Sequence, residues 1–369
     1  MNILYIEPFY TGSHKQWIDS YSLYSKYNIE ILSLPGRYWK WRMHGAAITL
    51  AKKFIDNNKK YDIIIASDML NLPLFISLCR KQINNTKIVT YFHENQILYS
   101  KAPVAQKELL NRDLHYAFIN YTSSLVSDIN LFNSNYHLNL YLEELEKYLN
   151  KKPEYKNRYT LEIIKKKSSV LHIGCDLEKF SPVLNYANKI PILLWNHRWE
   201  HDKNPELFFN TLIELKKNKV KYKLVILGQR FSRIPEIFTE IEEKLKSEIM
   251  HIGYCESFDD YKKWMHKADI IPITSYQDFF GISIVESVYC NTRPLLPNRL
   301  SYPEILLKED NPELFYDNDS ELYNKLFELI DDYKNLRNTT SSYASIVNRF
   351  DWSIMKNKYD DLFNKIYNS

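Results

Sequence analysis

The chain has 369 residues, of which 45% are hydrophobic and 25% are charged, and its formal net charge is +4. These values are ordinary for globular proteins. They exclude a fibrous or largely disordered chain, and the length predicts about two domains. A net charge this small does not identify a nucleic-acid-binding protein by itself.

Neither a membrane span nor a secretion signal is predicted. No run approaches the roughly 18 apolar residues of a span, and the opening MNILYIEPFY has no basic stretch before its apolar residues. We therefore expect a cytoplasmic protein with no membrane partner. The cysteines form no CxxC pair, so neither a zinc site nor a disulfide framework is predicted.

Along the chain, short apolar runs alternate with stretches of helical period, the pattern of parallel sheets covered by helices. The candidate strands of the first half are 2–7, 29–35, 62–67, 87–94, 129–134 and 168–174. Those of the second half are 191–198, 222–228, 249–254, 269–275 and 293–298, with helices at 205–217, 234–246, 258–266 and from 319 onward. The prediction is an α/β protein with two Rossmann-like doubly wound domains facing a central cleft, where ligands bind beyond the carboxyl ends of the strands.

The segment WNHRWEHDKNPE is the first candidate phosphate site. It places Arg198 at the end of a candidate strand and Lys203 just before a helix that begins near Pro205. Two cations beside a helix N-terminus can stabilise the charge of a departing diphosphate. A solvated pair on a polar loop is the alternative.

A second element, QDFFGISIVESVYC, places Asp278 before a helix and Glu286 on its second turn. Two carboxylates there can contact hydroxyls of a sugar and a ribose, while the NH groups of Gly281 and Ile282 reach phosphates. The alternative is an N-terminal cap at Asp278 and a paired core carboxylate at Glu286. The spacing does not decide between the two interpretations.

In the first half, YTGSHKQW follows the first strand with Gly12, Ser13, His14 and Lys15, a loop that can contact sugar or phosphate or can simply be a capped turn. The strand KIVTYFHE brings His93, Glu94 and Asn95 to the edge of the sheet. A histidine there can contact a sugar hydroxyl or accept a proton, and a structural histidine is the alternative.

The segment LPGRYWKWRMHG alternates aromatic and basic side chains, a composition typical of RNA contacts. Its candidate contacts are Arg37, Trp39, Lys40, Trp41 and Arg42. A surface helix with its aromatic side chains turned inward is the alternative. A second basic stretch, 147–167, can grip an RNA backbone.

The ordered motifs in the second half resemble the donor site of the retaining glycosyltransferases of family 4, which have GT-B architecture. They are RxxxxK from Arg198 to Lys203, HIGYCESFDDYKKWMHKADI, and DFFGISIVESVYC. A closer resemblance, to the tRNA-queuosine mannosyltransferases, is carried by IEPFYTGSHKQW, LPGRYWKWRMHGAA, YFHENQ, FNSNYH, WNHRWEHDKNPE, FFGISIVESVYC and SYPE. It covers the whole chain and implies retaining transfer of mannose from GDP-mannose to queuosine in tRNA, without a metal or other cofactor.

The resemblance also implies domains and roles. Residues 1–185 would bind the acceptor, 186–350 the nucleotide sugar, and 351–369 would form a helix that crosses back to the first domain. Arg198 and Lys203 would hold the diphosphate, Glu286 the ribose and Asp278 the transferred sugar, with His93 beside that sugar. The remaining donor residues would be Gly12, Gly253, Tyr254, Phe280, Gly281 and Ile282, and the acceptor residues Ser13, His14, Lys15, Glu94, Asn95 and the five of the aromatic and basic segment.

One departure from the family pattern concerns Asp278, which stands where family members usually have Glu. Its shorter side chain puts the sugar contact in question. Two alternatives stay open at this point: a transferase for a lipid-linked or surface polysaccharide acceptor, and a catalytically idle RNA-binding protein of the same fold.

Overall fold

The computed structural model describes residues 1–83, 85–97, 115–184, 186–230 and 234–369. The chain divides into two compact units, each built on a parallel six-stranded sheet. The first unit contains the described residues up to Gly174 and the C-terminal Trp352–Ser369, and the second contains Cys175–Asp351. The sequence-based division placed these borders at 185/186 and 350/351.

The sheet of the first unit has the strand order β2-β1-β3-β4-β5-β6. Its central strands are apolar and buried; all five residues of IIIAS in β3 are buried, because helices cover both faces. The strands are β1 (Asn2–Tyr10), β2 (Asn28–Pro35), β3 (Ile63–Ser67), β4 (Lys87–Phe92), β5 (Ile129–Phe132) and β6 (Ser168–Val170). The helices are α1 (Gly12–Tyr24), α2 (Trp39–Asn57), α3 (Leu72–Cys79), α5 (His115–Val126), α6 (Asn135–Asn150), α7 (Tyr159–Lys166) and α15 (Trp352–Tyr367).

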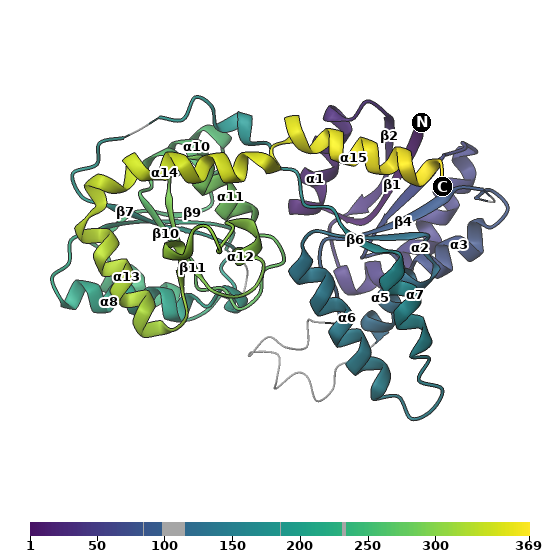
Figure 1. Ribbon diagram of the computed structural model, residues 1–369, viewed down its shortest axis with the longest axis horizontal. Helices are drawn as coiled ribbons and strands as arrows, with labels where there is room; N and C mark the ends of the chain where they lie inside the picture. The colour runs from purple at the N-terminus through teal and green to yellow at the C-terminus, as the bar shows by residue number, and fades with distance from the viewer. Residues whose placement is uncertain (84, 98–114, 185, 231–233) are drawn as a thin grey trace. The chain divides into compact units, whose positions relative to one another are not determined.

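Helix α15, at the end of the chain, packs against α1 within the first unit (Figure 1). The Trp17 indole NH donates a 2.9 Å hydrogen bond to the Tyr359 hydroxyl, and the Tyr21 hydroxyl donates one of 2.9 Å to the buried carboxylate of Asp360. A Cβ on Gly174 would lie 2.5 Å from the Trp352 ring, so only glycine allows this approach.

The sheet of the second unit has the order β12-β11-β10-β7-β8-β9. Trp199 stacks on Phe238 in its core, with ring centroids 4.4 Å apart. The strands are β7 (Ile192–Asn196), β8 (Lys223–Leu227), β9 (Ile249–Gly253), β10 (Ile270–Pro272), β11 (Arg293–Pro297) and β12 (Phe315–Tyr316). The main helices are α8 (Pro205–Lys217), α9 (Ile237–Lys244), α10 (Phe258–Lys267), α11 (Ile282–Tyr289), α12 (Tyr302–Ile305), α13 (Asp319–Asp331) and α14 (Tyr333–Val347).

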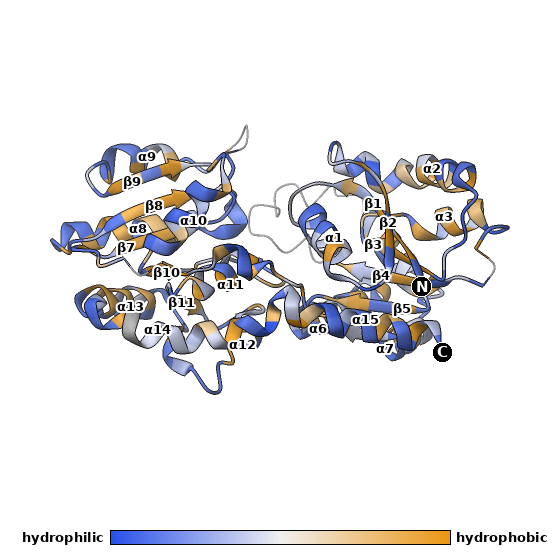
Figure 2. Cartoon of the chain, turned by 90° about the horizontal axis from the view of Figure 1, so that it is seen from above, coloured by the Kyte–Doolittle hydropathy of each residue, from blue (hydrophilic) through white to orange (hydrophobic). Residues whose placement is uncertain are grey.

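The predicted fold class is confirmed. Strands are coloured mostly as hydrophobic in Figure 2, while the helices also carry hydrophilic residues, as expected for sheets enclosed by amphipathic helices. The short strand β12 was missed, because two residues give no periodicity to recognise. All strands of each sheet are parallel, so their carboxyl ends share one edge.

Candidate functional site

The loop after β7 carries the predicted pair of cations. Arg198 is more than half exposed, and its Nη2 lies 3.2 Å from Glu200 Oε2. Lys203 lies in a short 3₁₀ turn, His201–Lys203, that leads into α8. Asn204 and Pro205 begin that helix, because the Asn204 side chain accepts a hydrogen bond from the Leu207 NH and proline fits the first helical position.

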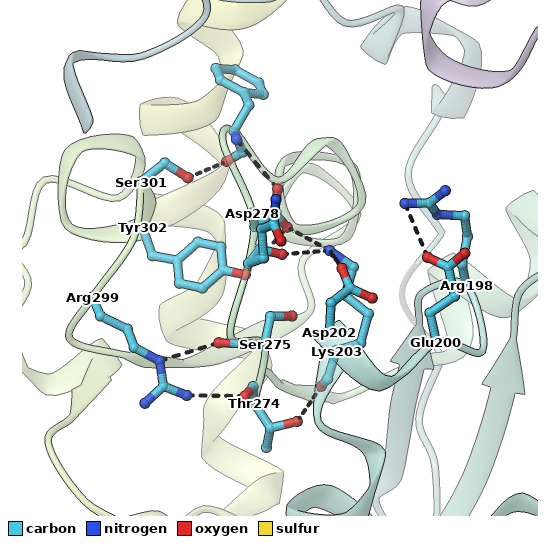
Figure 3. A network of polar contacts seen from close by, with 12 residues as sticks. Arg198, Glu200, Asp202, Lys203, Thr274, Ser275, Asp278, Arg299, Ser301 and Tyr302 are labelled. Carbon is cyan, nitrogen blue, oxygen red and sulfur yellow. Dashed lines mark hydrogen bonds and ion pairs between the residues drawn. The ribbon is translucent and has the colours of Figure 1, made fainter. Parts of the chain in front are cut away.

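The Lys203 side chain is only 11% exposed and lies between two loops (Figure 3). Its Nζ donates a 2.7 Å hydrogen bond to the Gln277 carbonyl and lies 3.3 Å from Asp202 and 3.9 Å from Asp278. The Thr274 hydroxyl donates to the Lys203 carbonyl at 2.9 Å, which ties the two loops together. The ammonium group is therefore held in place before any ligand arrives.

Asp278 belongs to the loop between β10 and α11. Its Oδ1 accepts a 3.3 Å hydrogen bond from the Phe280 NH and its Oδ2 one of 3.3 Å from the Tyr302 hydroxyl. Figure 3 shows the carboxylate between Tyr302 and Lys203. The N-cap of α11 is Gly281 and not Asp278, so the capping alternative for Asp278 is wrong.

Helix α11 begins beside this loop. Gly281 has a φ of +97°, a conformation that L side chains rarely adopt, which accounts for glycine at the helix start. The NH groups of Ile282 and Ser283 are in the first turn, where no intrahelical acceptor exists. The Phe280 side chain is buried against Phe350, so only its backbone is left to contact a donor. A helix start next to Lys203 and Asp278 suits a phosphate.

Glu286 lies on the second turn of α11 and is buried. Its Oε2 accepts a 2.7 Å hydrogen bond from the Tyr261 hydroxyl, which in turn accepts one of 2.8 Å from Asn196 at the end of β7. Burial raises the pKa of Glu286 to about 7, and the Tyr261 bond and the charge of Lys179 oppose that rise. The carboxyl group can therefore change protonation near neutral pH.

Two further predicted donor residues lie at the end of β9. Gly253 is its last residue, with open space where a Cβ would stand. Tyr254 follows and is 69% exposed. An exposed aromatic ring at the carboxyl edge of the sheet is available to a nucleotide base.

Sequence reasoning missed His197, which lies between the end of β7 and Arg198. It is buried, and its Nε2 has no hydrogen-bond partner among the described residues. Burial, together with the nearby charges of Lys203 and Arg198, holds the pKa of His197 well below its usual value. A neutral histidine is therefore held beside the two cations. A histidine directly before the RxxxxK arginine was the only sequence signal.

The carboxyl edge of the first unit carries a buried polar network around His93. His93 follows β4, and its backbone NH donates a 2.9 Å hydrogen bond to Asp68 Oδ1 at the end of β3. Its ring packs against the ring of His14 of α1, with centroids 4.2 Å apart and the two planes tilted by 32°. His14 Nδ1 lies 3.0 Å from Glu7 Oε2. The predicted His14 and His93 are thus brought together, and sequence reasoning assigned no role to Glu7 or Asp68.

The other predicted acceptor residues of this edge differ in exposure. Asn95 is buried, and its Nδ2 lies 2.8 Å from His137 Nε2, which favours a structural role. Glu94 is partly exposed. Gly12, Ser13 and Lys15 are exposed in the first turn of α1, where Lys15 pairs with Asp19.

The aromatic and basic segment forms the start of α2. Trp39 packs against Tyr116, with centroids 5.4 Å apart, as the surface-helix alternative expects. Trp41 is 64% exposed, which that alternative does not expect. Arg37 and Lys40 are exposed, and Arg42 Nε donates a 3.2 Å hydrogen bond to the Pro35 carbonyl. The segment therefore divides into one packed ring and an exposed basic and aromatic surface.

The chain matches known proteins along almost its whole length. The model for the N-terminal part of tRNA-queuosine alpha-mannosyltransferases matches residues 2–175, and the model for group 1 glycosyl transferases matches residues 176–346. The tRNA-queuosine alpha-mannosyltransferase of Drosophila melanogaster is 35% identical over 378 residues, covering 99% of this chain and 97% of that protein. The chain belongs to the tRNA-queuosine alpha-mannosyltransferase family.

As a member of this family the chain is a glycosyltransferase, and solved structures agree with the fold. Sucrose-phosphate synthase from Thermosynechococcus elongatus has a TM-score of 0.76 at 13% identity and covers 100% of this chain and 99% of its own. The catalytic domain of starch synthase IV from Arabidopsis thaliana has a TM-score of 0.75 at 12% identity, and the match covers 100% of both chains. These likenesses concern the fold alone.

Two kinds of feature are absent from the described part of this family member. No group of three or more His, Cys, Asp or Glu side chains there could hold a metal ion. No helix in the described ranges is long and apolar enough to cross a membrane.

Proposed function

We propose that this family member transfers mannose from GDP-mannose to queuosine in tRNA, with retention of the anomeric configuration. The proposal rests on one observation: a preorganised cation, Lys203, stands beside the start of α11 in a chain that matches the Drosophila enzyme from end to end. The sugar and the acceptor come from the name of that relative. The choice of GDP follows the family resemblance.

In the proposed reaction, the bond between the anomeric carbon and the diphosphate oxygen breaks. The acceptor hydroxyl oxygen attacks that carbon from the same face, and its proton passes to the leaving diphosphate. Lys203, Arg198 and the NH groups at the start of α11 stabilise the charge that develops on the diphosphate, so no metal is assigned a role. Lys203 contributes most, because its position is fixed and it is shielded from water.

The other residues of the second unit bind the rest of the donor. Glu286 accepts a hydrogen bond from a ribose hydroxyl in addition to the bond that its Oε2 accepts from Tyr261. Gly253 and Tyr254 receive the base, and Asp278 receives the sugar in addition to its contact with Lys203. His197, neutral and with a nitrogen that has no described partner, is a further candidate for a donor hydroxyl.

We assign the acceptor to the first unit. The edge around His14 and His93 takes the nucleoside, and the exposed Arg37, Lys40 and Trp41 take the RNA strand through phosphate pairing and stacking. A lipid-linked acceptor has weaker support. The Campylobacter jejuni N-acetylgalactosaminyltransferase whose name specifies an undecaprenol-linked substrate is 25% identical over only 40% of each chain.

The experiment is a transfer assay with a panel of donors. The purified protein is incubated with tRNA that carries queuosine, and separately with the same tRNA carrying guanosine at that position, plus GDP-mannose, GDP-glucose, UDP-glucose or UDP-galactose. Mass spectrometry of the digested nucleosides is expected to show a hexose on queuosine with GDP-mannose alone. Equal transfer from a UDP-sugar would overturn the assignment of GDP-mannose as the donor. Transfer to neither tRNA would overturn the assignment of queuosine as the acceptor.

Thermal stabilisation by the same four donors supplies a readout without catalysis, since a ligand that binds only the native state raises its stability. A shift with GDP-mannose but no transfer would leave the donor assignment intact and reject the acceptor.

A further inference from the structure

The carboxylate of Glu7 is fully enclosed in the first unit's polar network. Glu7 lies in β1, is 0% exposed, and carries two pairs of contacts. Oε1 accepts hydrogen bonds from the Phe9 NH at 2.8 Å and the Ser67 hydroxyl at 3.1 Å. Oε2 accepts one from the Tyr5 hydroxyl at 2.9 Å and lies 3.0 Å from His14 Nδ1. Glu7 therefore cannot reach a substrate itself.

His14 is the basic group that faces the Glu7 carboxylate, and the pairing has an electrostatic consequence. A carboxylate removed from water is costly to keep ionised unless a cation accompanies it. Burial by itself would lower the pKa of His14, but the charge and hydrogen bond of Glu7 outweigh it, and the charges of Asp68 and Glu94 add to the effect, so the pKa rises to about 9. His14 carries a proton on each ring nitrogen at neutral pH.

The neighbouring ring is in the opposite state. Burial lowers the pKa of His93 well below its usual value, and the positive charge of His14 and the proximity of His137 lower it further. His93 Nε2 lies 3.3 Å from the Tyr5 hydroxyl, which donates to Glu7. The titratable groups that face the two rings are Tyr5, Glu7, Asp68, Tyr91, Glu94 and His137.

We propose that Glu7 is a positioning residue of the transferase, whose carboxylate fixes the ring of His14 and holds a proton on it for an oxygen of the substrate. Because Glu7 occupies Nδ1, the Nε2–H of His14 is the donor left for a hydroxyl or phosphate oxygen. His14 and His93 are 8% and 7% exposed, whereas Glu7 is fully enclosed, so Glu7 acts through His14. The inference rests on the proposed transfer, with His14 at the substrate.

The test begins with Glu7→Gln, which keeps the shape and removes the charge. In the wild-type protein, NMR titration of the His14 ring is expected to give a pKa near 9. In the variant, the charge of Glu7 no longer opposes burial, so the pKa of His14 should fall well below about 9. This readout does not depend on activity. It therefore separates a failure of this inference from a failure of the proposed function.

Kinetics supply the second readout. Glu7→Gln is expected to lower kcat for tRNA mannosylation by about 100-fold, the lower end of what a positioned proton donor contributes, with little change in the KM for the donor. If Glu7 acts through His14, the double variant Glu7→Gln, His14→Ala should be no slower than His14→Ala alone. A purely structural role would instead make the two losses multiply. Glu7→Asp should recover part of the rate.

Asp360→Asn is the matched control, because Asp360 is another buried carboxylate of the first unit that accepts hydrogen bonds from Tyr21, Ser25 and Lys26. It should lower the melting temperature while leaving kcat and the titration of His14 unchanged. An unchanged pKa of His14 in Glu7→Gln, or an equal loss of kcat in Asp360→Asn, would overturn the proposal.

Discussion

Lys203 Nζ lies 3.9 Å from Asp278 Oδ2, although the two residues follow different strands, β7 and β10. The same Asp278 oxygen accepts a hydrogen bond from the Tyr302 hydroxyl. The carboxylate thus braces the cation that is assigned to the diphosphate. The shorter aspartate, which departs from the family's usual glutamate, is within reach of Lys203 because the Gln277 carbonyl and Asp202 hold the ammonium group nearby.

Replacing Lys203 by alanine is expected to raise the free energy of the transition state by about 2.7 to 4 kcal/mol, the scale of one lost oxyanion donor. The value of kcat/KM should fall accordingly, by about 10²- to 10³-fold. Arg198→Ala should lose less, because Arg198 is more exposed and water screens its charge. The measurement is initial rate at saturating tRNA. Lys216→Ala is the control. Lys216 lies at the other end of α8 and pairs with Glu248, so its loss should affect stability alone. Near-normal rates for Lys203→Ala would remove it from the donor site.

Asp278→Asn should weaken the contact between Asp278 and Lys203, because it removes the negative charge and keeps the shape of the side chain. We expect a lower kcat and a modest fall in melting temperature, because the largely buried ammonium of Lys203 keeps Asp202 as its remaining carboxylate. Asp278→Glu, the usual family residue, should keep most activity. Steady-state kinetics with calorimetric melting would decide, and a fully active Asp278→Asn protein would show that the contact is incidental.

Glu286 should give donor binding a pH dependence near neutrality. Since its pKa is raised to about 7, the carboxylate is more ionised above that pH, and GDP should bind more tightly there if a ribose hydroxyl donates to it. Isothermal titration at pH values on both sides of 7 measures the effect. Glu286→Gln should bind more weakly and without this dependence. If the dissociation constant of the variant equals that of the wild type at every pH, Glu286 is structural.

The pair of Glu7 and His14 should make stability fall at alkaline pH. The folded pKa of His14 is raised from 6.5 to about 9, so the folded state binds the extra proton and is stabilised fully below 6.5. That contribution is lost as the pH rises through 9. Urea unfolding of wild type and His14→Ala at pH values below 6.5 and above 9 should show the variant's deficit shrinking at high pH. A deficit independent of pH would indicate lost packing instead.

The start of α2 is expected to bind tRNA. Changing Arg37, Lys40 and Arg42 to alanine should weaken tRNA binding and flatten its salt dependence while leaving GDP affinity nearly unchanged. The matched control changes Lys52, Lys53 and Lys60, exposed lysines at the other end of α2 or just beyond it, and should leave tRNA affinity close to that of the wild type. Binding would be measured at two salt concentrations. If both triple variants lose the same tRNA affinity, the effect comes from net charge and not from a binding site at the start of α2.

Much of the architecture was determined by the sequence itself. Runs such as IIIAS and KLVIL are too short and too apolar for surface helices, and between amphipathic stretches they form buried parallel strands. The Asn-Pro step at Asn204 and Pro205 begins α8 by local chemistry alone. Lys203 and Gly281 were therefore assigned to helix starts without any knowledge of distant contacts, and the ordered motifs supplied the family.

Only the tertiary structure decided which side chains contact one another and which are buried away from a substrate. Glu7 belongs to the motif IEPFYTGSHKQW, but its partners come from β1, α1 and the end of β3, so no local pattern shows which groups its carboxylate meets. Asn95 was expected to face a substrate, yet it turns inward to His137. The physical reason is common to both: burial and charge pairing depend on residues up to 60 positions away, and these are set by the order of strands in the sheet, which periodicity does not encode.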